Sequence, residues 1–341
     1  MKRIACLLFL TAWIQVSAQE NINYQKPPEE ILKLVDVELA PSVLIDDKNS
    51  SMVLRYRDSF KSIAELSEKE LRLAGLRINP KTNIGSRTTY YKNIKVVDLK
   101  GKNGDTKQVA NLPANARLAN FSWSPDQNKM AFTHTTTEGV EVWVLDIQSA
   151  SAKKLTRANV NANMRDVVNW FEDSQAILVK MLPAERKPII DQASVVPTGP
   201  TISTNDGKKA QNRTYQDLLK NKVDEDNFEQ LATSVIQKVN MDGTSAQWLG
   251  SAMYTNISFS PDGNYVMITN VERPFSYLVP YYRFPSTTAI YSRDGKLVKT
   301  VEKVPLIEDL PKGFMSVRKG KRSFSWRSDK AASLVYAEAL D

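Results

Sequence analysis

Four segments of the chain repeat one pattern, and this repeat limits the possible fold more than any other feature. In each segment an aromatic residue precedes a polar turn by two or three residues, and an apolar stretch follows. The segments are Phe121–Phe132 (FSWSPDQNKMAF), Val168–Val179 (VNWFEDSQAILV), Ile257–Ile268 (ISFSPDGNYVMI) and Phe324–Val335 (FSWRSDKAASLV). Pro fixes φ in such a turn, while Asp and Gly permit the tight reversal. The pattern is typical of the inner strands of β-propeller blades, where the aromatic packs between blades.

The spacing of the aromatic residues predicts how the repeats are organised. The step from Trp123 to Trp170 suits one blade of about 40–50 residues, and the later steps to Phe259 and Trp326 leave room for added loops. The main insertion is expected over residues 183–233. We therefore predict an all-β fold, an incomplete β-propeller with about five blade starts and short helical insertions. The four aromatic residues are expected in the core.

Local patterns predict the remaining elements. Period-two alternation beside Gly and Asp predicts hairpins around Gly101–Asp105, Asp242–Gly243 and Asp294–Gly295. A strand, a turn and a second strand are expected over residues 43–54, and a final strand over residues 333–337. Helical turns are expected over residues 31–36, 62–76 and 214–221. The acidic patch Asp224–Asp226 is expected to flank the last of these helices as solvated surface.

The first 18 residues have the pattern of a secretory signal peptide. Met1, Lys2 and Arg3 form a basic start, an apolar run follows, and the small residues before Ala18 suit cleavage after that position. A membrane anchor is disfavoured, because the apolar run is too short to span a bilayer. We expect an exported protein, periplasmic or extracellular, with a lead-in over residues 19–42 and the partial propeller over residues 43–341. No later segment is long and apolar enough to span a membrane.

The sequence offers little for catalysis or metal binding. The single cysteine, Cys6, lies in the predicted signal peptide, and the single histidine, His134, lies in a predicted strand with no nucleophile motif to serve. The nearest approach to Gly-x-Ser-x-Gly is Gly243–Gln247, which ends in Gln inside a predicted hairpin. Neither a metal-ligand spacing nor a phosphate loop is found, so no catalytic residue, metal or cofactor is expected. The basic run Arg318–Arg322 is interpreted as a solvated turn rather than a nucleic-acid site.

Several strings together resemble the N-terminal propeller of secreted serine peptidases of the prolyl oligopeptidase family, in the branch that includes the glutamyl endopeptidases. They are Leu73–Pro80, Phe121–Asp126, Pro197–Pro200, Thr214–Asn221, Glu272–Pro285, Ser323–Arg327 and Tyr336–Asp341, and Glu272–Pro285 (ERPFSYLVPYYRFP) is the most specific. In that family a C-terminal α/β-hydrolase domain carries a Ser-Asp-His triad, and the propeller caps this domain and filters substrates. The resemblance implies that this chain stops before the catalytic domain. Its expected partners are a peptide substrate and the missing hydrolase domain of the same polypeptide.

The aromatic segment from Arg273 to Pro285 is the candidate contact site, with two interpretations open. Its tyrosines could bond a peptide backbone and its arginines could pair with an acidic side chain, or the whole segment could be packing between blades. The candidate contact residues are Arg273, Tyr277, Tyr281, Tyr282 and Arg283. The sequence thus predicts the non-catalytic, substrate-gating portion of an exported serine peptidase, with cleavage after Glu implied by the resemblance alone. The alternative is a stand-alone periplasmic propeller that binds a protein or a glycan.

Overall fold

The computed structural model describes residues 25–101, 105–196, 199, 214–311 and 316–339, and it divides into two units, Met1–Glu38 and Leu39–Asp341. The described part of the first unit holds helix α2 (Glu29–Val35), where the sequence predicts a helical turn. Glu29 and Glu30 lie in its first turn and Lys33 in its last, which suits the helix dipole. The predicted signal peptide and most of the Pro197–Pro200 string lie outside the described residues.

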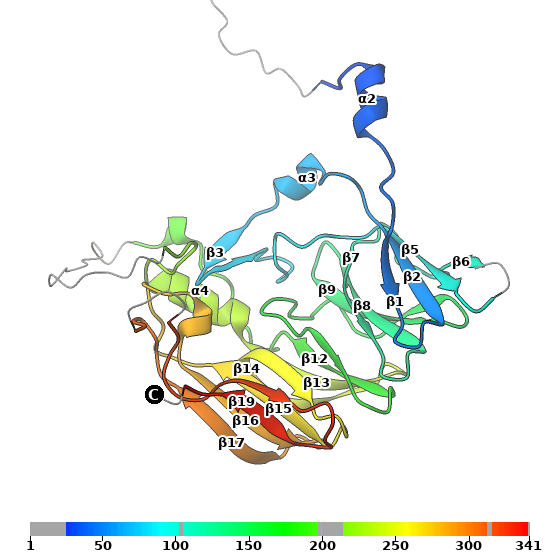
Figure 1. Ribbon diagram of the computed structural model, residues 1–341. Helices are drawn as coiled ribbons and strands as arrows, with labels where there is room; N and C mark the ends of the chain where they lie inside the picture. The colour runs from blue at the N-terminus through cyan, green and yellow to red at the C-terminus, as the bar shows by residue number, and fades with distance from the viewer. Residues whose placement is uncertain (1–24, 102–104, 197–198, 200–213, 312–315, 340–341) are drawn as a thin grey trace, which may run out of the picture. The chain divides into compact units, whose positions relative to one another are not determined.

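Antiparallel sheets make up the described part of the second unit (Figure 1). Two sheets have four strands, one has seven, and two are hairpins. The strands, grouped by sheet, are β1 (Ser42–Ile45), β2 (Ser51–Tyr56), β5 (Asn93–Asp98) and β6 (Thr106–Gln108); β7 (Leu118–Trp123), β8 (Lys129–Thr135), β9 (Val140–Asp146) and β10 (Ser151–Lys154); β11 (Val168–Trp170), β12 (Ala176–Met181), β13 (Ser234–Asn240), β14 (Ser245–Phe259), β15 (Tyr265–Val271), β16 (Ser286–Ser292) and β17 (Leu297–Val304); β3 (Leu71–Leu73) and β4 (Leu76–Ile78); and β18 (Arg322–Trp326) and β19 (Leu334–Ala337). The helical turns are α3 (Ile63–Leu66), η1 (Gln192–Ser194), α4 (Lys222–Ala232) and η2 (Tyr281–Arg283).

The seven-stranded sheet consists of two four-stranded parts that share β14. The first half of this 15-residue strand pairs with β13, and the second half, from Met253, pairs with β15. Irregular register in both pairings marks the bend between the halves. The third copy of the sequence repeat, Ile257–Ile268, therefore begins within the shared strand. The β-rich class and the hairpins around Asp242–Gly243 and Asp294–Gly295 are confirmed, whereas ring closure and the number of blades stay predictions.

The Ser-Pro-Asp turns of two repeats are held by the same side-chain hydrogen bonds. The Ser124 hydroxyl donates to Asp126 at 2.6 Å and accepts from the Lys129 backbone N–H at 2.9 Å. The Ser260 hydroxyl makes the equivalent bonds to Asp262 at 2.6 Å and from Tyr265 at 3.0 Å. These bonds close the turn between an inner strand and the next, so the repeated Ser-Pro-Asp sequence produces the same chain reversal in both repeats.

The repeated tryptophans connect one repeat to the preceding one. The indole N–H of Trp170 donates to the Ser122 carbonyl at 3.1 Å, and that of Trp326 donates to the Ser258 carbonyl at 3.1 Å. Each acceptor immediately precedes the aromatic residue of another repeat. Trp170 is buried, but Trp123, Phe259 and Trp326 are only half-buried. Trp123 and Phe259 nevertheless pack against buried clusters, so the expectation of core aromatics is confirmed in full for Trp170 and in part for these two.

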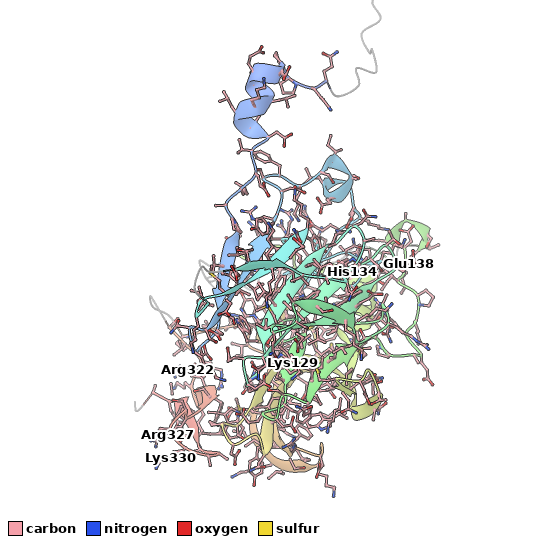
Figure 2. All side chains as sticks on the ribbon, turned by 90° about the vertical axis from the view of Figure 1, so that its right-hand side faces the viewer. Lys129, His134, Glu138, Arg322, Arg327 and Lys330 are labelled. Carbon is pink, nitrogen blue, oxygen red and sulfur yellow. The ribbon has the colours of Figure 1, made fainter. Side chains whose placement is uncertain are left out.

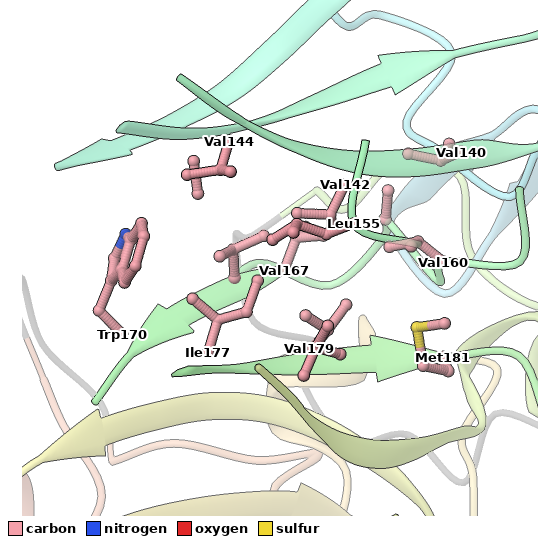
Figure 3. Packing of buried hydrophobic residues seen from close by; sticks show 14 of the residues in the cluster. Val140, Val142, Val144, Leu155, Val160, Val167, Trp170, Ile177, Val179 and Met181 are labelled. Atoms are coloured by element: carbon pink, nitrogen blue, oxygen red, sulfur yellow. The ribbon is translucent and has the colours of Figure 1, made fainter. Parts of the chain in front are cut away.

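The sheets pack face to face through branched apolar side chains. Figure 3 shows Val142 and Val144 of β9 opposite Ile177 and Val179 of β12, with Trp170 at one end of the cluster. These strands belong to different sheets, so the cluster is an inter-sheet core of the kind that interdigitating valine and isoleucine faces produce. A second core, described with the site below, joins helix α4 to the β3–β4 hairpin.

Two predicted helices are placed wrongly. Over residues 62–76, helix α3 ends at Leu66, and the β3–β4 hairpin follows, because Ala74 and Gly75 adopt positive φ of 52° and 86° and reverse the chain. A Cβ on Gly75 would lie 2.8 Å from the Pro280 Cβ, so glycine also permits this close approach. The helix predicted over residues 214–221 begins instead after Asn221, whose side chain caps the Asp224 N–H at 2.9 Å.

Candidate functional site

The aromatic segment, residues 272–285, is a loop between β15 and β16 that packs on helix α4. The Glu272 N–H donates to the Pro285 carbonyl at 2.7 Å and closes the base of the loop. Further along, the Tyr281 N–H donates to the Ala74 carbonyl at 2.9 Å, which ties the loop to the β3–β4 turn. The loop, the hairpin and α4 thus share one framework, although they are far apart in sequence.

Helix α4 presents an apolar face to this framework. Phe228 is fully buried, and its ring meets Phe275 and Phe284 edge-on, with centroids 5.1 Å and 5.7 Å away. Phe275 and Phe284 stack on each other at 5.2 Å. Edge-to-face and stacked pairs each add to the stability of simple burial. This aromatic cluster fixes the loop on the helix.

The outer face of α4 holds the polar end of the loop. Arg273 donates to Glu225 and to Glu229 at 2.8 Å each, and its guanidinium lies 4.3 Å from the Phe275 ring centroid. The Tyr277 hydroxyl donates to Glu225 at 2.6 Å, and this bond to a carboxylate raises the pKa of Tyr277 to about 12. Glu225 and Glu229 are four residues apart, so one helix face presents both carboxylates to Arg273. The two carboxylates therefore compensate the charge of Arg273 within the fold.

The other three candidate residues take different positions. Tyr281 is half-buried against the apolar core of α4, and Tyr282 is 64% exposed. Arg283 is buried, with its guanidinium 5.2 Å from the Tyr215 ring centroid. Its Nη1 has no hydrogen-bond partner among the residues that the structure describes. The structure thus brings Arg273 and Tyr277 together, turns Tyr282 outward and places Arg283 inside; contact of these residues with a peptide or another domain stays a prediction.

The acidic patch Asp224–Asp226 is not the solvated flank that the sequence suggests. It forms the first turns of α4, where Asp224 is buried and accepts the Lys220 backbone N–H at 2.9 Å. Burial raises the pKa of the Asp224 carboxyl. Glu225 pairs with Arg273, and Asp226 lies 3.1 Å from the Lys222 ammonium. The patch therefore attaches the loop to the helix.

Sequence reasoning missed a buried lysine beside this region. Lys180 of β12 is fully buried, and its ammonium donates to the carbonyls of Asn163, at 2.7 Å, of Met164, at 3.2 Å, and of Arg165. Burial lowers the pKa of Lys180 to about 7. A lysine inside the apolar run of β12 could have indicated a buried charge, but the sequence does not reveal which carbonyls accept its hydrogen bonds. They converge because Met164 and Arg165 have positive φ.

Three buried asparagines, also missed, hold the C-terminal end of α4. The side-chain amides of Asn83, Asn161 and Asn163 all donate to the Leu231 carbonyl, at 3.1, 3.0 and 2.7 Å. The last carbonyls of a helix lack partners within the helix, so these donors satisfy an otherwise exposed end. Asparagines at scattered positions carry no sequence pattern that predicts this convergence.

The single histidine has a carboxylate partner inside a sheet. Nδ1 of His134 lies 3.3 Å from Glu141, which also accepts the Trp143 indole N–H at 2.9 Å. His134 and Glu141 are both buried, and they lie on the neighbouring strands β8 and β9. His134 is labelled in Figure 2. Over the described ranges, no three His, Cys, Asp or Glu side chains gather as a metal site would need. No helix in that part of the chain is long and apolar enough to cross a membrane.

Known proteins resemble the chain over nearly its whole length. No family model matches it. It is 34% identical over 332 residues to a probable chloroplastic glutamyl endopeptidase of Oryza sativa subsp. japonica, and 32% identical over 331 residues to the protein of the same name in Arabidopsis thaliana. Both matches cover 94% of this chain, but only 35% and 34% of the relatives. The chain therefore spans about a third of their length.

Among solved structures, the acylaminoacyl peptidase of Pyrococcus horikoshii is 15% identical, with a TM-score of 0.43, over 80% of this chain and 33% of that one. A putative TolB from Agrobacterium tumefaciens is 13% identical, with a TM-score of 0.34, over 78% of this chain and 81% of that one. The identity to the plant proteins extends over almost the whole chain, and it confirms the resemblance seen in the sequence. The chain is therefore related to a region of about a third of the plant glutamyl endopeptidases, the branch that its sequence resembles.

Proposed function

We propose that the chain is the non-catalytic, substrate-gating β-propeller portion of an exported serine peptidase that acts on peptides. The observation that carries this proposal is the pattern of coverage: the match takes in 94% of the chain but only about a third of each relative. A hydrolase domain elsewhere in the same polypeptide would supply the catalytic groups. Cleavage after Glu is the specificity that the names of the relatives suggest for the whole protein.

The packing of α4 on the 272–285 loop supports a gating role for this region. Both connections leave the seven-stranded sheet and are joined by the Phe228 cluster and by the ion pairs of Arg273. Tyr282 and Leu278 stay 64% and 63% exposed on this layer. Exposed aromatic and aliphatic side chains on a rigid support suit contact with a peptide or with a neighbouring domain.

The test is the intact mass of the native protein isolated from the cell envelope and treated with a fluorophosphonate probe. The proposal expects a species of about three times this length that reacts covalently with the probe, since activated serines are the target of that reagent. A species of this length that remains unlabelled would reject the proposal. That outcome would favour the alternative, a stand-alone periplasmic propeller that binds a protein or a glycan.

A further inference from the structure

Four polar side chains form a single row across the second half of the seven-stranded sheet. Register partners connect Asn256 of β14 to Thr269 of β15, Thr269 to Thr288 of β16, and Thr288 to Glu302 of β17. Register partners in antiparallel strands point to the same face. The threonine hydroxyls lie 2.8 Å apart and bond to each other. Thr269, Thr288 and Glu302 are half-buried and Asn256 is exposed, so the row lies partly open to solvent.

This polar row is one wall of a cavity of about 250 Å³. The β18 strand lines the opposite side with Arg322 and Phe324, and Arg318 lies beside Glu302 at 3.4 Å. Met267 and Val304 add apolar surface. The cavity therefore combines hydrogen-bonding groups with an aromatic ring, in a volume near the lower end of ligand pockets.

The charges around this cavity do not cancel. Arg318 donates to Glu302 and to the Lys319 and Lys321 carbonyls, so both members of that pair are occupied. Arg322, labelled in Figure 2, has a buried Nη1 with no hydrogen-bond partner in the described part of the chain. A buried guanidinium nitrogen without an acceptor is costly, and a carboxylate is its best planar complement. Arg322 lines the cavity, and no ion pair compensates its charge among the residues that the structure describes.

We infer that the cavity between the polar row and β18 binds a small carboxylate, with Arg322 as the anion-binding residue. The threonine hydroxyls and the Asn256 amide would bond a neighbouring polar group of the ligand, and Phe324 would cover its apolar part. The carboxylate could belong to a free organic acid or to the C-terminus of a peptide, since both present the same group. The inference concerns residues outside the 272–285 loop and holds whether or not the proposed peptidase function is correct.

The experiment titrates the full chain by calorimetry with N-acetylalanine and with its uncharged analogue, N-acetylalaninamide. The acid is expected to bind at least about 10-fold more tightly than the amide, because only the acid pairs with Arg322. Arg322→Gln is expected to remove that preference. No binding of the acid at roughly 10 mM, or equal binding of acid and amide, would overturn the inference. Tighter binding of inorganic phosphate than of the acid would overturn the ligand class.

Arg327→Gln is the matched control. Arg327 follows the same strand but pairs with Asp329 at 2.6 Å and does not line the cavity. Its variant should bind the acid within about 2-fold of wild type, and an equal loss in both variants would indicate non-specific charge attraction and reject the site.

If Arg322→Gln does not fold, Thr288→Val gives the second test, since it removes a lining hydroxyl and should weaken acid binding several-fold. A pentaalanine probe with a free C-terminus distinguishes the sources: binding equal to that of N-acetylalanine indicates a peptide terminus, and much weaker binding indicates a free acid.

Discussion

Lys180→Met offers the sharpest test of how the buried part of β12 is held to its neighbouring segments. The ammonium of Lys180 is fully buried and donates to the carbonyls of three successive residues, Asn163, Met164 and Arg165. The last two have φ of 56° and 59°, in the left-handed region that non-glycine residues seldom adopt. Methionine keeps the length of the side chain but supplies no donor, so three carbonyls lose their partner.

The stability lost in Lys180→Met depends on pH, because the protonation of Lys180 is linked to folding. Burial lowers the pKa of Lys180 from its ordinary value of 10.5 to about 7. Between these values the unfolded chain binds more protons than the folded one, so wild-type stability rises with pH. The rise between pH 7 and pH 9 amounts to about 2 kcal/mol. Lys180→Met lacks this dependence, so its deficit should grow from about 1 kcal/mol at pH 7 to about 3 kcal/mol at pH 9.

Urea unfolding of wild type and variant at pH 7, 8 and 9, followed by tryptophan fluorescence, measures this deficit. The matched control is Lys153→Met, which removes an exposed lysine that also lies near two carbonyls, 3.4 Å from each, and should change stability by less than about 1 kcal/mol. A Lys180→Met deficit that stays constant between pH 7 and pH 9 would refute the reasoning. The three carbonyls would then hold the ammonium charged, and burial would not govern its titration.

Three further changes test the packing of the site and the repeats. Phe228→Ala should cost about 3–5 kcal/mol of unfolding free energy and increase proteolysis of the 272–285 loop, whereas Phe60→Ala, at a 74% exposed residue, should cost under about 0.5 kcal/mol. Trp170→Phe should cost about 1–2 kcal/mol in urea unfolding, because the Ser122 carbonyl loses its indole donor, and no loss would contradict the bond between repeats. Tyr282→Ala should leave stability within about 0.5 kcal/mol but raise KM for peptides in the full-length peptidase that we propose, and an unchanged KM would remove this residue from the contact surface.

The strands and hairpins were predictable because residues close together in the sequence determine the turns between them. A Ser-Pro-Asp turn carries its own hydrogen bonds, as the matching contacts of Ser124 and Ser260 demonstrate, so the letters alone locate the reversal. Asp242–Gly243 and Asp294–Gly295 locate hairpins for the same reason. The exposure of the repeated aromatics was not predictable, because it depends on how far each sheet covers its neighbour, and the sequence does not state that.

The helices and the site were less predictable because distant residues decide them. The 62–76 segment has helical spacing, but Gly75 must approach Pro280 closely, and Leu73 and Ile78 gain burial only as a hairpin. Glu225 and Glu229 have a spacing that suggests one helix face. Nothing in the sequence indicates that Arg273, more than 40 positions away, is their partner.

Arg273 and Arg322 differ in whether their charge is already compensated, and this bears on where a carboxylate could bind. Arg283 also has an Nη1 without a partner among the described residues, but it does not line the cavity. Arg273 is held by Glu225 and Glu229, so an acidic peptide would have to displace a partner that the fold supplies at high effective concentration. Arg322 has no such partner among the described residues, and it lines a cavity with hydrogen-bonding groups already in place. Electrostatic recognition depends on charge left uncompensated rather than on the number of arginines. Arg273 therefore fixes the loop on α4, its contact with a peptide stays a prediction, and we infer that Arg322 and the polar row beside it recognise a carboxylate.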